Sequence, residues 1–357
     1  MKIGIFSKLE MAGGSEFRCA EMANGFARFA GCHVKILSEN GIPKRIKEYL
    51  DKSVSIIENV FEKIDNDYSK VKEFYDLDCL LIVNTDCKSF TGLDFWNGKS
   101  DRHGAVVDLT KIRKMIFLFN FLVSPSRHLS TLSQYCSDIR IITTNSKFFN
   151  EISSQDRYES IRHFPRIILQ SPINPELLSS TKKESSRIRI GMHSRGQDDK
   201  WNSDWEKIIK KCNERIQDKI SFDFMGISNS LLSKVKDIPN VICRKENSIT
   251  VKEFLTGLDI FAFLPSWSRE EPWARVVAEA MTSACPVITT KKGGNMDQII
   301  QGHNGFLCDN IDCVFKNIVY LVEHNDMRNV MAKNAFRLSK NFTTEKVISK
   351  FIEFVEA

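Results

Sequence analysis

Short apolar runs alternate with longer helical stretches along this chain, and the alternation occurs twice. In the first half, a helix is expected from about 15 to 30, followed by a charged helical region that continues to about residue 73. Strand-like runs lie at 2–7, 34–37, 79–84, 114–120 and 138–143. Such alternation predicts an α/β domain with a parallel sheet that helices cover.

A proline- and serine-rich segment, 170–186, separates this half from a second alternation and is interpreted as a linker. Strands are expected in the second half at 188–193, 221–225, 241–244, 259–264 and 286–289. A last amphipathic helix is expected from about 343 to 356. The predicted domains are 1–175 and 176–340, both Rossmann-like, followed by a C-terminal helix, 341–357.

Length and composition agree with two domains. A chain of 357 residues exceeds one ordinary core, and 42% hydrophobic with 27% charged residues is typical of a globular protein. No signal-like segment or membrane-length apolar stretch is evident, and the ten cysteines lack paired spacing such as C-x-x-C. A cytoplasmic location with reduced thiols is expected.

The net charge of +6 is modest, and basic residues are interleaved with acidic ones. This balance suits anionic substrates or loose peripheral contact with the inner membrane face, and it gives little support for nucleic-acid binding.

The most informative segment is 266–290, into which the strand-like run 259–265 leads, and which passes through a polar turn into a helical pattern. Pro272 stands just before the first turn of that helix, so the backbone N–H groups of about residues 274–276 should form an anion site. A diphosphate is expected there. The donor-binding candidates at this helix start are Trp273, Ala274, Arg275 and Val276.

Two carboxylates, Glu271 and Glu279, flank this helix start eight residues apart. At a rise of ~1.5 Å per residue they could lie roughly 10–12 Å apart. One would accept hydrogen bonds from sugar hydroxyls and the other from ribose hydroxyls. Most such glutamate pairs on their own are solvated surface residues.

The surroundings favour the functional interpretation. The segment resembles the Glu-x7-Glu block of GT-B glycosyltransferases, especially the retaining family four (glycosyl transferases group 1), and 280–294 and 304–306 also resemble that family's donor domain. The resemblance is strong over about 187–310 and weaker before it. It implies two Rossmann-like domains facing a central cleft, and a final helix that packs back on the N-terminal, acceptor-side domain.

The resemblance further implies a retaining transferase that needs no metal or other cofactor. It would move a sugar from a nucleoside diphosphate sugar to a hydroxyl of a glycan or lipid-linked glycan, in surface polysaccharide, lipopolysaccharide or glycolipid biosynthesis. Glu271, Arg195 and Lys200 are the expected catalytic residues, with both cations on the diphosphate. The pair Asp198 and Asp199 is interpreted as a solvated turn rather than a metal site.

Other candidates depend on their place in the pattern. Gly13 and Gly14 follow the first strand, where the family has a glycine-rich loop that approaches the ligand closely. Arg244 and Lys245 end a strand at which the family reads the nucleobase, and Glu279 is assigned to donor binding.

The N-terminal half departs from the family pattern. Many members place a histidine after the fifth strand, where this chain has Asn120, which hydrogen-bonds but does not titrate. His103, in a polar loop after the fourth strand, is a candidate to share that role. His128, His163 and His193 are interpreted as structural or solvated.

Four alternatives remain open at this point. A sugar-nucleotide epimerase would isomerise the donor without an acceptor, and a phosphorylase would require a pyridoxal lysine that cannot be placed. Asn120, in place of a histidine, leaves open a catalytically idle GT-B homologue that acts as a partner subunit. A two-lobed periplasmic binding protein would need export and would bind a sugar that lacks a nucleotide.

Overall fold

The structure is a computed structural model with two compact units. It describes residues 1–7, 9, 14–62, 69–83, 93–94, 99–100, 107–119, 129, 132–183 and 185–357. The N-terminal unit comprises Met1–Pro172 and Thr344–Ala357, and the C-terminal unit comprises Ile173–Thr343. The chain thus passes from one unit to the other after Pro172 and again after Thr343. The boundaries expected from the sequence were after residues 175 and 340.

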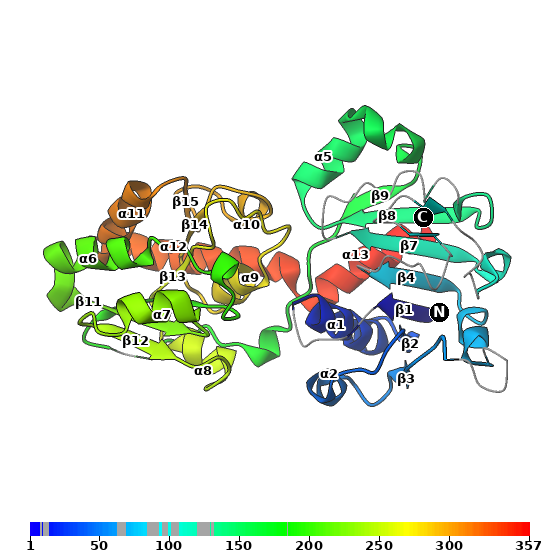
Figure 1. Ribbon diagram of the computed structural model, residues 1–357, viewed down its shortest axis with the longest axis horizontal. Coiled ribbons are helices and arrows are strands. Elements are labelled where there is room, and N and C mark those ends of the chain that lie inside the picture. The colour runs from blue at the N-terminus through cyan, green and yellow to red at the C-terminus, as the bar shows by residue number, and fades with distance from the viewer. Residues whose placement is uncertain are drawn as a thin grey trace. The chain divides into compact units, whose positions relative to one another are not determined.

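The N-terminal unit is built on a seven-stranded sheet in the order β3-β2-β1-β4-β7-β8-β9, and every neighbouring pair is parallel (Figure 1). Its strands are β1 Lys2–Ser7, β2 His33–Ser38, β3 Ser55–Ile57, β4 Cys79–Val83, β7 Lys114–Phe119, β8 Asp138–Thr143 and β9 Arg166–Ile168. A separate antiparallel pair joins β5 Leu93–Asp94 to β6 Lys99–Ser100. The helices are α1 Gly14–Phe29, α2 Lys44–Tyr49, α5 Ser146–Ser154 and α13 Thr344–Glu356, and the 3-10 helices are η1 Ser69–Phe74, η3 Leu109–Lys111 and η4 Asp156–Ile161.

Both faces of this sheet are buried, which explains the continuous apolar runs of its strands. On β4, Leu80 and Ile82 join one hydrophobic cluster, whereas Leu81 and Val83 join the cluster on the opposite face. Successive side chains of a strand point to opposite faces of the sheet, and on β4 both faces carry apolar side chains.

The final helix, α13, packs against α1 of the N-terminal unit. The two helices approach closely at Gly25, where an added Cβ would lie 2.6 Å from side-chain carbons of Thr344 and Ile348. The buried face of α13 consists of Thr344, Val347, Ile348, Phe351 and Val355. At the helix start, the Thr344 hydroxyl donates a hydrogen bond to Glu21 of α1.

The C-terminal unit has a six-stranded parallel sheet in the order β12-β11-β10-β13-β14-β15. Its strands are β10 Ile188–His193, β11 Ile220–Met225, β12 Val241–Arg244, β13 Ile260–Phe263, β14 Val287–Thr290 and β15 Gly305–Cys308. Its helices are α6 Trp205–Ile216, α7 Asn229–Val235, α8 Val251–Thr256, α9 Arg275–Thr282, α10 Asn295–Gln298, α11 Ile311–Glu323 and α12 Asn325–Ser339, and its 3-10 helices are η5 Pro175–Leu177, η6 Asp198–Lys200, η7 Gln217–Lys219 and η8 Lys340–Phe342. The expectation of two α/β, Rossmann-like units with parallel sheets is therefore confirmed.

One local expectation was wrong. The charged region expected to be helical up to residue 73 contains β3, which pairs with β2 as an edge strand, because sheet pairing outweighs the local helical preference. The segment 170–186, interpreted as a linker, contains the change from one unit to the other between Pro172 and Ile173. Beyond that point it packs on the C-terminal unit: Ile173 and Leu178 belong to its hydrophobic core, and Lys182 donates to the Leu255 carbonyl at 3.1 Å.

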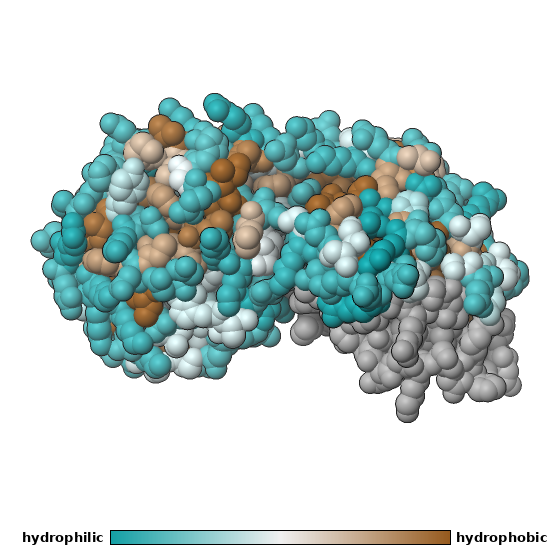
Figure 2. Space-filling model, turned by 90° about the horizontal axis from the view of Figure 1, so that it is seen from above, coloured by the Kyte–Doolittle hydropathy of each residue, from teal (hydrophilic) through white to brown (hydrophobic). Residues whose placement is uncertain are grey.

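Polar residues cover most of the described surface of the C-terminal unit in the view of Figure 2, and apolar residues occur there in separate groups. Leu177, Ile242, Met296, Ile300 and Val330 are the large apolar side chains of this unit that are most exposed. Within the described residues, none of the helices is both long and apolar enough to cross a bilayer.

Candidate functional site

Most of the candidate residues of the C-terminal unit lie at one edge of its sheet. Arg195 and Lys200 follow β10, Glu271 lies in the loop after β13, and Glu279 lies on α9. The carboxyl ends of parallel strands meet at this edge, which is where open α/β sheets bind their ligands. The fold thus brings together residues that are distant in the sequence. Arg195 and Glu279, for example, are 84 positions apart.

Glu271 is the centre of a cluster of charges. Lys200 and Arg269 both donate to its Oε1 atom, and Arg269 also pairs with Asp199. The side chains of Glu271 and Lys200 are only 10% and 13% exposed. Oε2 of Glu271 accepts no hydrogen bond from any residue that the structure describes. This second oxygen is therefore available to a ligand hydroxyl.

The surroundings of Glu271 favour its charged form, whereas those of Lys200 disfavour its charged form. Burial raises the pKa of Glu271, but the attraction of Lys200 and Arg269 is larger in sum and leaves that pKa below its usual 4.5. Burial lowers the pKa of Lys200, and Glu271 offsets only part of that shift. Because Glu271 stays ionised, it can only accept hydrogen bonds.

Two glycines determine the position of the Glu271 loop. Gly293 has a φ of +52°, and the N–H of Gly294 donates to the Glu271 carbonyl at 2.8 Å. A Cβ on Gly294 would lie 2.0 Å from the carbonyl oxygen of Pro272, which no side chain tolerates. The turn after β14 therefore contacts, through its backbone, the loop that carries Glu271.

The start of α9 differs in part from the expectation. The Ala274 N–H donates to Oε1 of Gln298 at 3.3 Å, and the Val277 N–H donates to the Ala274 carbonyl at 3.0 Å. The anion site expected at about residues 274–276 therefore cannot use the Ala274 amide as a free donor. The backbone N–H of Val276, the second residue of the helix, is therefore the group of the first turn that we consider for binding a phosphate.

Trp273 is buried in the core instead of facing a ligand. Its side chain is 6% exposed and packs edge-to-face on Phe342 with the ring centroids 4.9 Å apart. Burial of so large a ring beneath the helix start stabilises the loop that carries Glu271. Its side chain is therefore a packing element, and the donor-binding role expected for Trp273 is limited to its backbone.

Glu279 lies between two basic side chains. Arg275 donates from Nε to its Oε1 at 2.8 Å, and Nε2 of His193 lies 3.5 Å from its Oε2. His193 Nε2 has no hydrogen-bond partner in the described structure. Burial lowers the pKa of His193 below 6.5, and Arg275 adds to this shift while Glu279 opposes it. His193 is therefore neutral at pH 7, and its contact with Glu279 is not an ion pair.

We expect His193 to make the protein less stable in mild acid. Its pKa is depressed in the folded state, so the unfolded chain binds the proton first and stability falls as the pH drops below 6.5 towards the folded pKa. Replacing His193 by Phe, beside Phe254 and Phe261, should reduce the loss between about pH 7.5 and pH 5.5 by an amount of order 1 kcal/mol.

The measurement is denaturant unfolding at both pH values without ligand. His303→Phe, at an exposed position of the same unit, is the matched control, and it should lose as much stability in acid as the parent protein does. An equal acid loss in His193→Phe and in the parent would contradict the assignment.

Arg195 lies on the turn after β10, and its carbonyl accepts a hydrogen bond from Nε1 of Trp201 at 3.0 Å. Its half-buried guanidinium has no hydrogen-bond or ion-pair partner among the described residues. Its charge also lowers the pKa of Lys200, although less than burial does. A cation without a counter-charge beside a second cation is suited to an anionic ligand.

The remaining candidates are more scattered. Arg244 donates two hydrogen bonds to Asp223, from Nε at 2.8 Å and from Nη2 at 2.9 Å, and Lys245 is exposed. Gly14 begins α1 with open space around it. Gly13, His103, Asn120 and His128 lie outside the described residues, so their expected roles stay predictions.

The acidic pair after β10 has protein partners. Asp198 accepts from the Ser230 hydroxyl, and Asp199 pairs with Arg269. In the described part of the chain, no group of three or more His, Cys, Asp or Glu side chains is placed to hold a metal ion.

Two residues of this site were not identified from the sequence. Arg269 links Asp199 to Glu271. The only sequence feature that could have indicated this role is its place two positions before Glu271. His193 was interpreted as structural or solvated, although its place at the end of β10 puts it at the ligand edge of the sheet. Neither signal distinguishes a site residue from an ordinary surface residue without the fold.

Comparison with known proteins shows which family part of this chain resembles. Residues 230–338 match the family model of glycosyl transferases group 1, and the matched region includes Glu271 and Glu279. Trehalose synthase of Thermococcus litoralis is 32% identical over 91 residues, which are 25% of this chain and 22% of that protein. The chain matches only between 22% and 37% of the length of such curated relatives.

Solved structures match over the full chain. HepE of Anabaena, solved in complex with UDP and glucose, has a TM-score of 0.73 at 16% identity, and the match covers 100% of both chains. A mutant of S. aureus TarM, solved with fondaparinux, alpha-GlcNAc-glycerol and UDP, has a TM-score of 0.70 at 10% identity and also covers 100% of both. At these identities the likeness establishes the fold, which is GT-B.

Proposed function

We propose that this chain, which has the GT-B fold and matches glycosyl transferases group 1 over residues 230–338, is a glycosyltransferase. It moves a sugar, with retention of anomeric configuration, from a nucleoside diphosphate sugar to a hydroxyl of a glycan or lipid-linked glycan. The observation on which this rests is the grouping of Glu271 and Glu279 with Arg195 and Lys200 at one edge of the C-terminal sheet.

Each residue has a proposed role. Arg195 and the Val276 amide bind the diphosphate, and Lys200 adds positive charge while it orients Glu271. Glu271 accepts a hydrogen bond from a hydroxyl of the transferred sugar. Glu279, oriented by Arg275, accepts from the ribose hydroxyls.

The chemical step exchanges one bond at the anomeric carbon. The bond to the departing phosphate oxygen breaks, the bond to the acceptor oxygen forms on the same face, and the acceptor proton passes to the leaving phosphate. Stabilising the charge that develops on the diphosphate is the main contribution of the protein, because donors fixed in advance are most effective in a partly dehydrated site. With two cations in this role, no metal ion is needed.

UDP is the first nucleotide to test, since HepE and TarM were both solved with it. A thermal-shift titration should show a rise in melting temperature with one nucleoside diphosphate among UDP, GDP and ADP, in the presence of EDTA. A ligand at ~100 times its dissociation constant adds about 2.7 kcal/mol to stability. Glu279→Ala should reduce this shift, because the ribose hydroxyls lose their acceptor.

Glu214→Ala, on an exposed face of α6, is the matched control and should keep the parental shift. Glu279→Gln separates loss of the charge from loss of the side chain. A cooperatively melting parent that responds to no nucleotide would contradict a nucleotide-sugar enzyme. Isomerisation of the free sugar nucleotide without an acceptor would indicate an epimerase instead.

The proposal extends to the acceptor and the location. The TarM complex with alpha-GlcNAc-glycerol and the net charge of +6 support a glycan or lipid-linked acceptor in cell-surface polysaccharide or glycolipid biosynthesis, reached from the cytoplasmic face of the inner membrane. Labelled sugar should enter a solvent-extractable lipid or a polymer. Label found only in free sugar would contradict this part of the proposal.

A further inference from the structure

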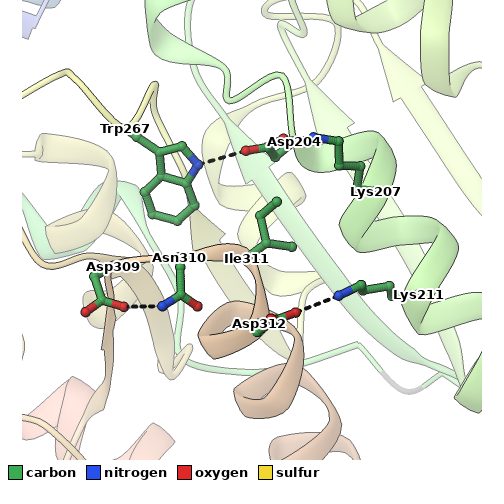
Figure 3. Close-up of a pocket in the computed structure, with 8 residues that line it drawn as sticks. All are labelled: Asp204, Lys207, Lys211, Trp267, Asp309, Asn310, Ile311 and Asp312. Carbon is green, nitrogen blue, oxygen red and sulfur yellow. Dashed lines mark hydrogen bonds and ion pairs between the residues drawn. The ribbon is translucent and has the colours of Figure 1, made fainter.

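A pocket of about 450 Å³ lies on the C-terminal unit, and none of the residues assigned to the donor lines it. It is formed where the first turns of α6, the loop after β13 and the start of α11 meet (Figure 3). Its volume falls in the range of about 300–1,000 Å³ that is typical of small-ligand sites. The lining residues are Asp204, Lys207, Lys211, Trp267, Asp309, Asn310, Ile311 and Asp312.

Trp267 supplies an aromatic surface in a fixed orientation. Its Nε1 donates to Oδ2 of Asp204 at 2.9 Å, and its carbonyl accepts from Lys292. The ring is half-buried, with one part packed against the hydrophobic core. Ile311, which is also half-buried, lines the same pocket (Figure 3). The pocket therefore has an apolar side on which a flat, weakly polar ligand face could pack.

The charged groups around this apolar side are already paired with one another. Asp204 accepts from Lys207 at 2.8 Å, and Asp312 accepts from Lys211 at 2.6 Å. The hydrogen bond from Lys207 is the main reason that the pKa of Asp204 lies below its usual 3.8, and the one from Lys211 has the same effect on Asp312. Both carboxylates stay ionised and remain acceptors.

The balance of charge disfavours an anionic ligand. Three carboxylates line the pocket against two ammonium groups, and each ammonium group is neutralised by an aspartate. Asp309 has a side-chain amide, that of Asn310, as its partner at 2.7 Å. A phosphate would meet net negative charge, whereas a hydroxyl can donate to a carboxylate and accept from an ammonium group.

The polar side of the pocket is held in place before any ligand binds. Asn310 caps α11, its Oδ1 accepting from the Cys313 N–H at 2.9 Å. This cap fixes the backbone of the turn that presents Asp309 and Asp312. A site whose polar groups are ordered in advance loses less entropy on binding.

We infer that this pocket is a second carbohydrate site, which binds a neutral glycan segment with one sugar face against Trp267. The C–H groups of the sugar pack on the indole, and its hydroxyls bond to Asp309, Asp312 and Lys211. The inference rests on the proposed function only in taking this glycan to be part of the acceptor or product. The pocket holds the glycan by groups that are distinct from those that bind the donor.

The loop that carries Trp267 connects this pocket with the donor site. Glu271 lies four residues further along the same loop, and the Ser266 N–H donates to the Asp199 carbonyl at 3.1 Å. A sugar packed on Trp267 would therefore restrict the segment that positions Glu271.

The test is a binding titration without nucleotide, so its result does not depend on donor binding. The probes are maltotriose, cellotriose and lactose, followed by tryptophan fluorescence and by saturation-transfer NMR. At least one neutral probe should bind the full-length parent. Trp267→Ala should raise its dissociation constant by about tenfold or more, equivalent to about 1.4 kcal/mol. Trp267→Phe keeps a ring and should bind better than Trp267→Ala.

Asp309→Asn removes an anionic acceptor from the pocket and should also weaken binding. The matched control, Asp218→Asn, lies in η7 at the far end of α6 and should bind like the parent. Each variant is checked for cooperative melting.

Three results would overturn the inference. The first is a folded parent that binds none of the probes up to about 10 mM, beyond the weak end of specific binding. The second is binding that persists unchanged in Trp267→Ala. The third is a preference for glucose 1-phosphate or inorganic phosphate over the neutral sugars.

Discussion

Arg195→Ala should transfer sugar at least about two orders of magnitude more slowly than the parent. The guanidinium has no partner among the described residues, so its charge is available to the diphosphate. Removing one fixed donor to a developing negative charge costs about 2–4 kcal/mol of barrier. The measurement is steady-state transfer with a labelled donor, and the fall should occur mainly in kcat because the charge develops in the transition state.

Arg215→Ala is the matched control for this substitution. Arg215 is an exposed residue of α6 whose ion pair with Glu323 is 3.5 Å long, and its loss should leave the rate of transfer unchanged. Arg195→Lys should recover part of the rate, since an ammonium group keeps the charge but not the forked geometry. Transfer by Arg195→Ala at nearly the parental rate would show that the diphosphate binds elsewhere.

Glu271→Ala should lower the free energy of unfolding by about 3 kcal/mol and abolish most transfer. The substitution leaves Lys200 and Arg269 facing each other without their shared carboxylate, in a place where Lys200 is 13% exposed. Removing one partner of a buried pair costs about 3–5 kcal/mol, because the other charge remains buried. Denaturant unfolding of the free protein near neutral pH measures the effect.

A double-mutant cycle identifies the cause of this loss. Adding Lys200→Ala to Glu271→Ala should destabilise the protein by much less than the sum of the single changes, since the uncompensated ammonium group is removed as well. The control is Glu206→Ala, which breaks the more exposed Lys210–Glu206 pair of α6 and should cost no more than about 0.5 kcal/mol. Additive effects at Glu271 and Lys200 would contradict the coupling.

Much of the fold could be predicted from the chain because its strands are buried on both faces. The strands Lys2–Ser7, Asp138–Thr143, Ile188–His193 and Val241–Arg244 begin and end where the apolar runs predict. Within the two parallel sheets, the strands that were not predicted are β3, β9 and β15, which have three or four residues each and lie at sheet edges. So short a run carries little periodicity, and pairing with a neighbouring strand decides its conformation.

The candidate site was predicted less completely. The spacing of Glu271 and Glu279 around a helix start is local, so it is visible in the sequence. The partners of Glu271 are not local, since Lys200 lies 71 positions away. The same holds for Gln298, which lies 24 positions from the Ala274 amide to which it bonds.

The sequence alone determined the two α/β units, the edge of the sheet at which the site residues gather and the types of charged group that gather there. These depend on hydrophobic periodicity and on turns, which act over a few residues. The tertiary structure decided how those groups are used. Glu271 is shared by two cations, Trp273 packs in the core, Arg244 binds Asp223 and Trp267 lines a separate pocket. These outcomes depend on burial and on contacts between distant segments, which exist only once the chain has folded.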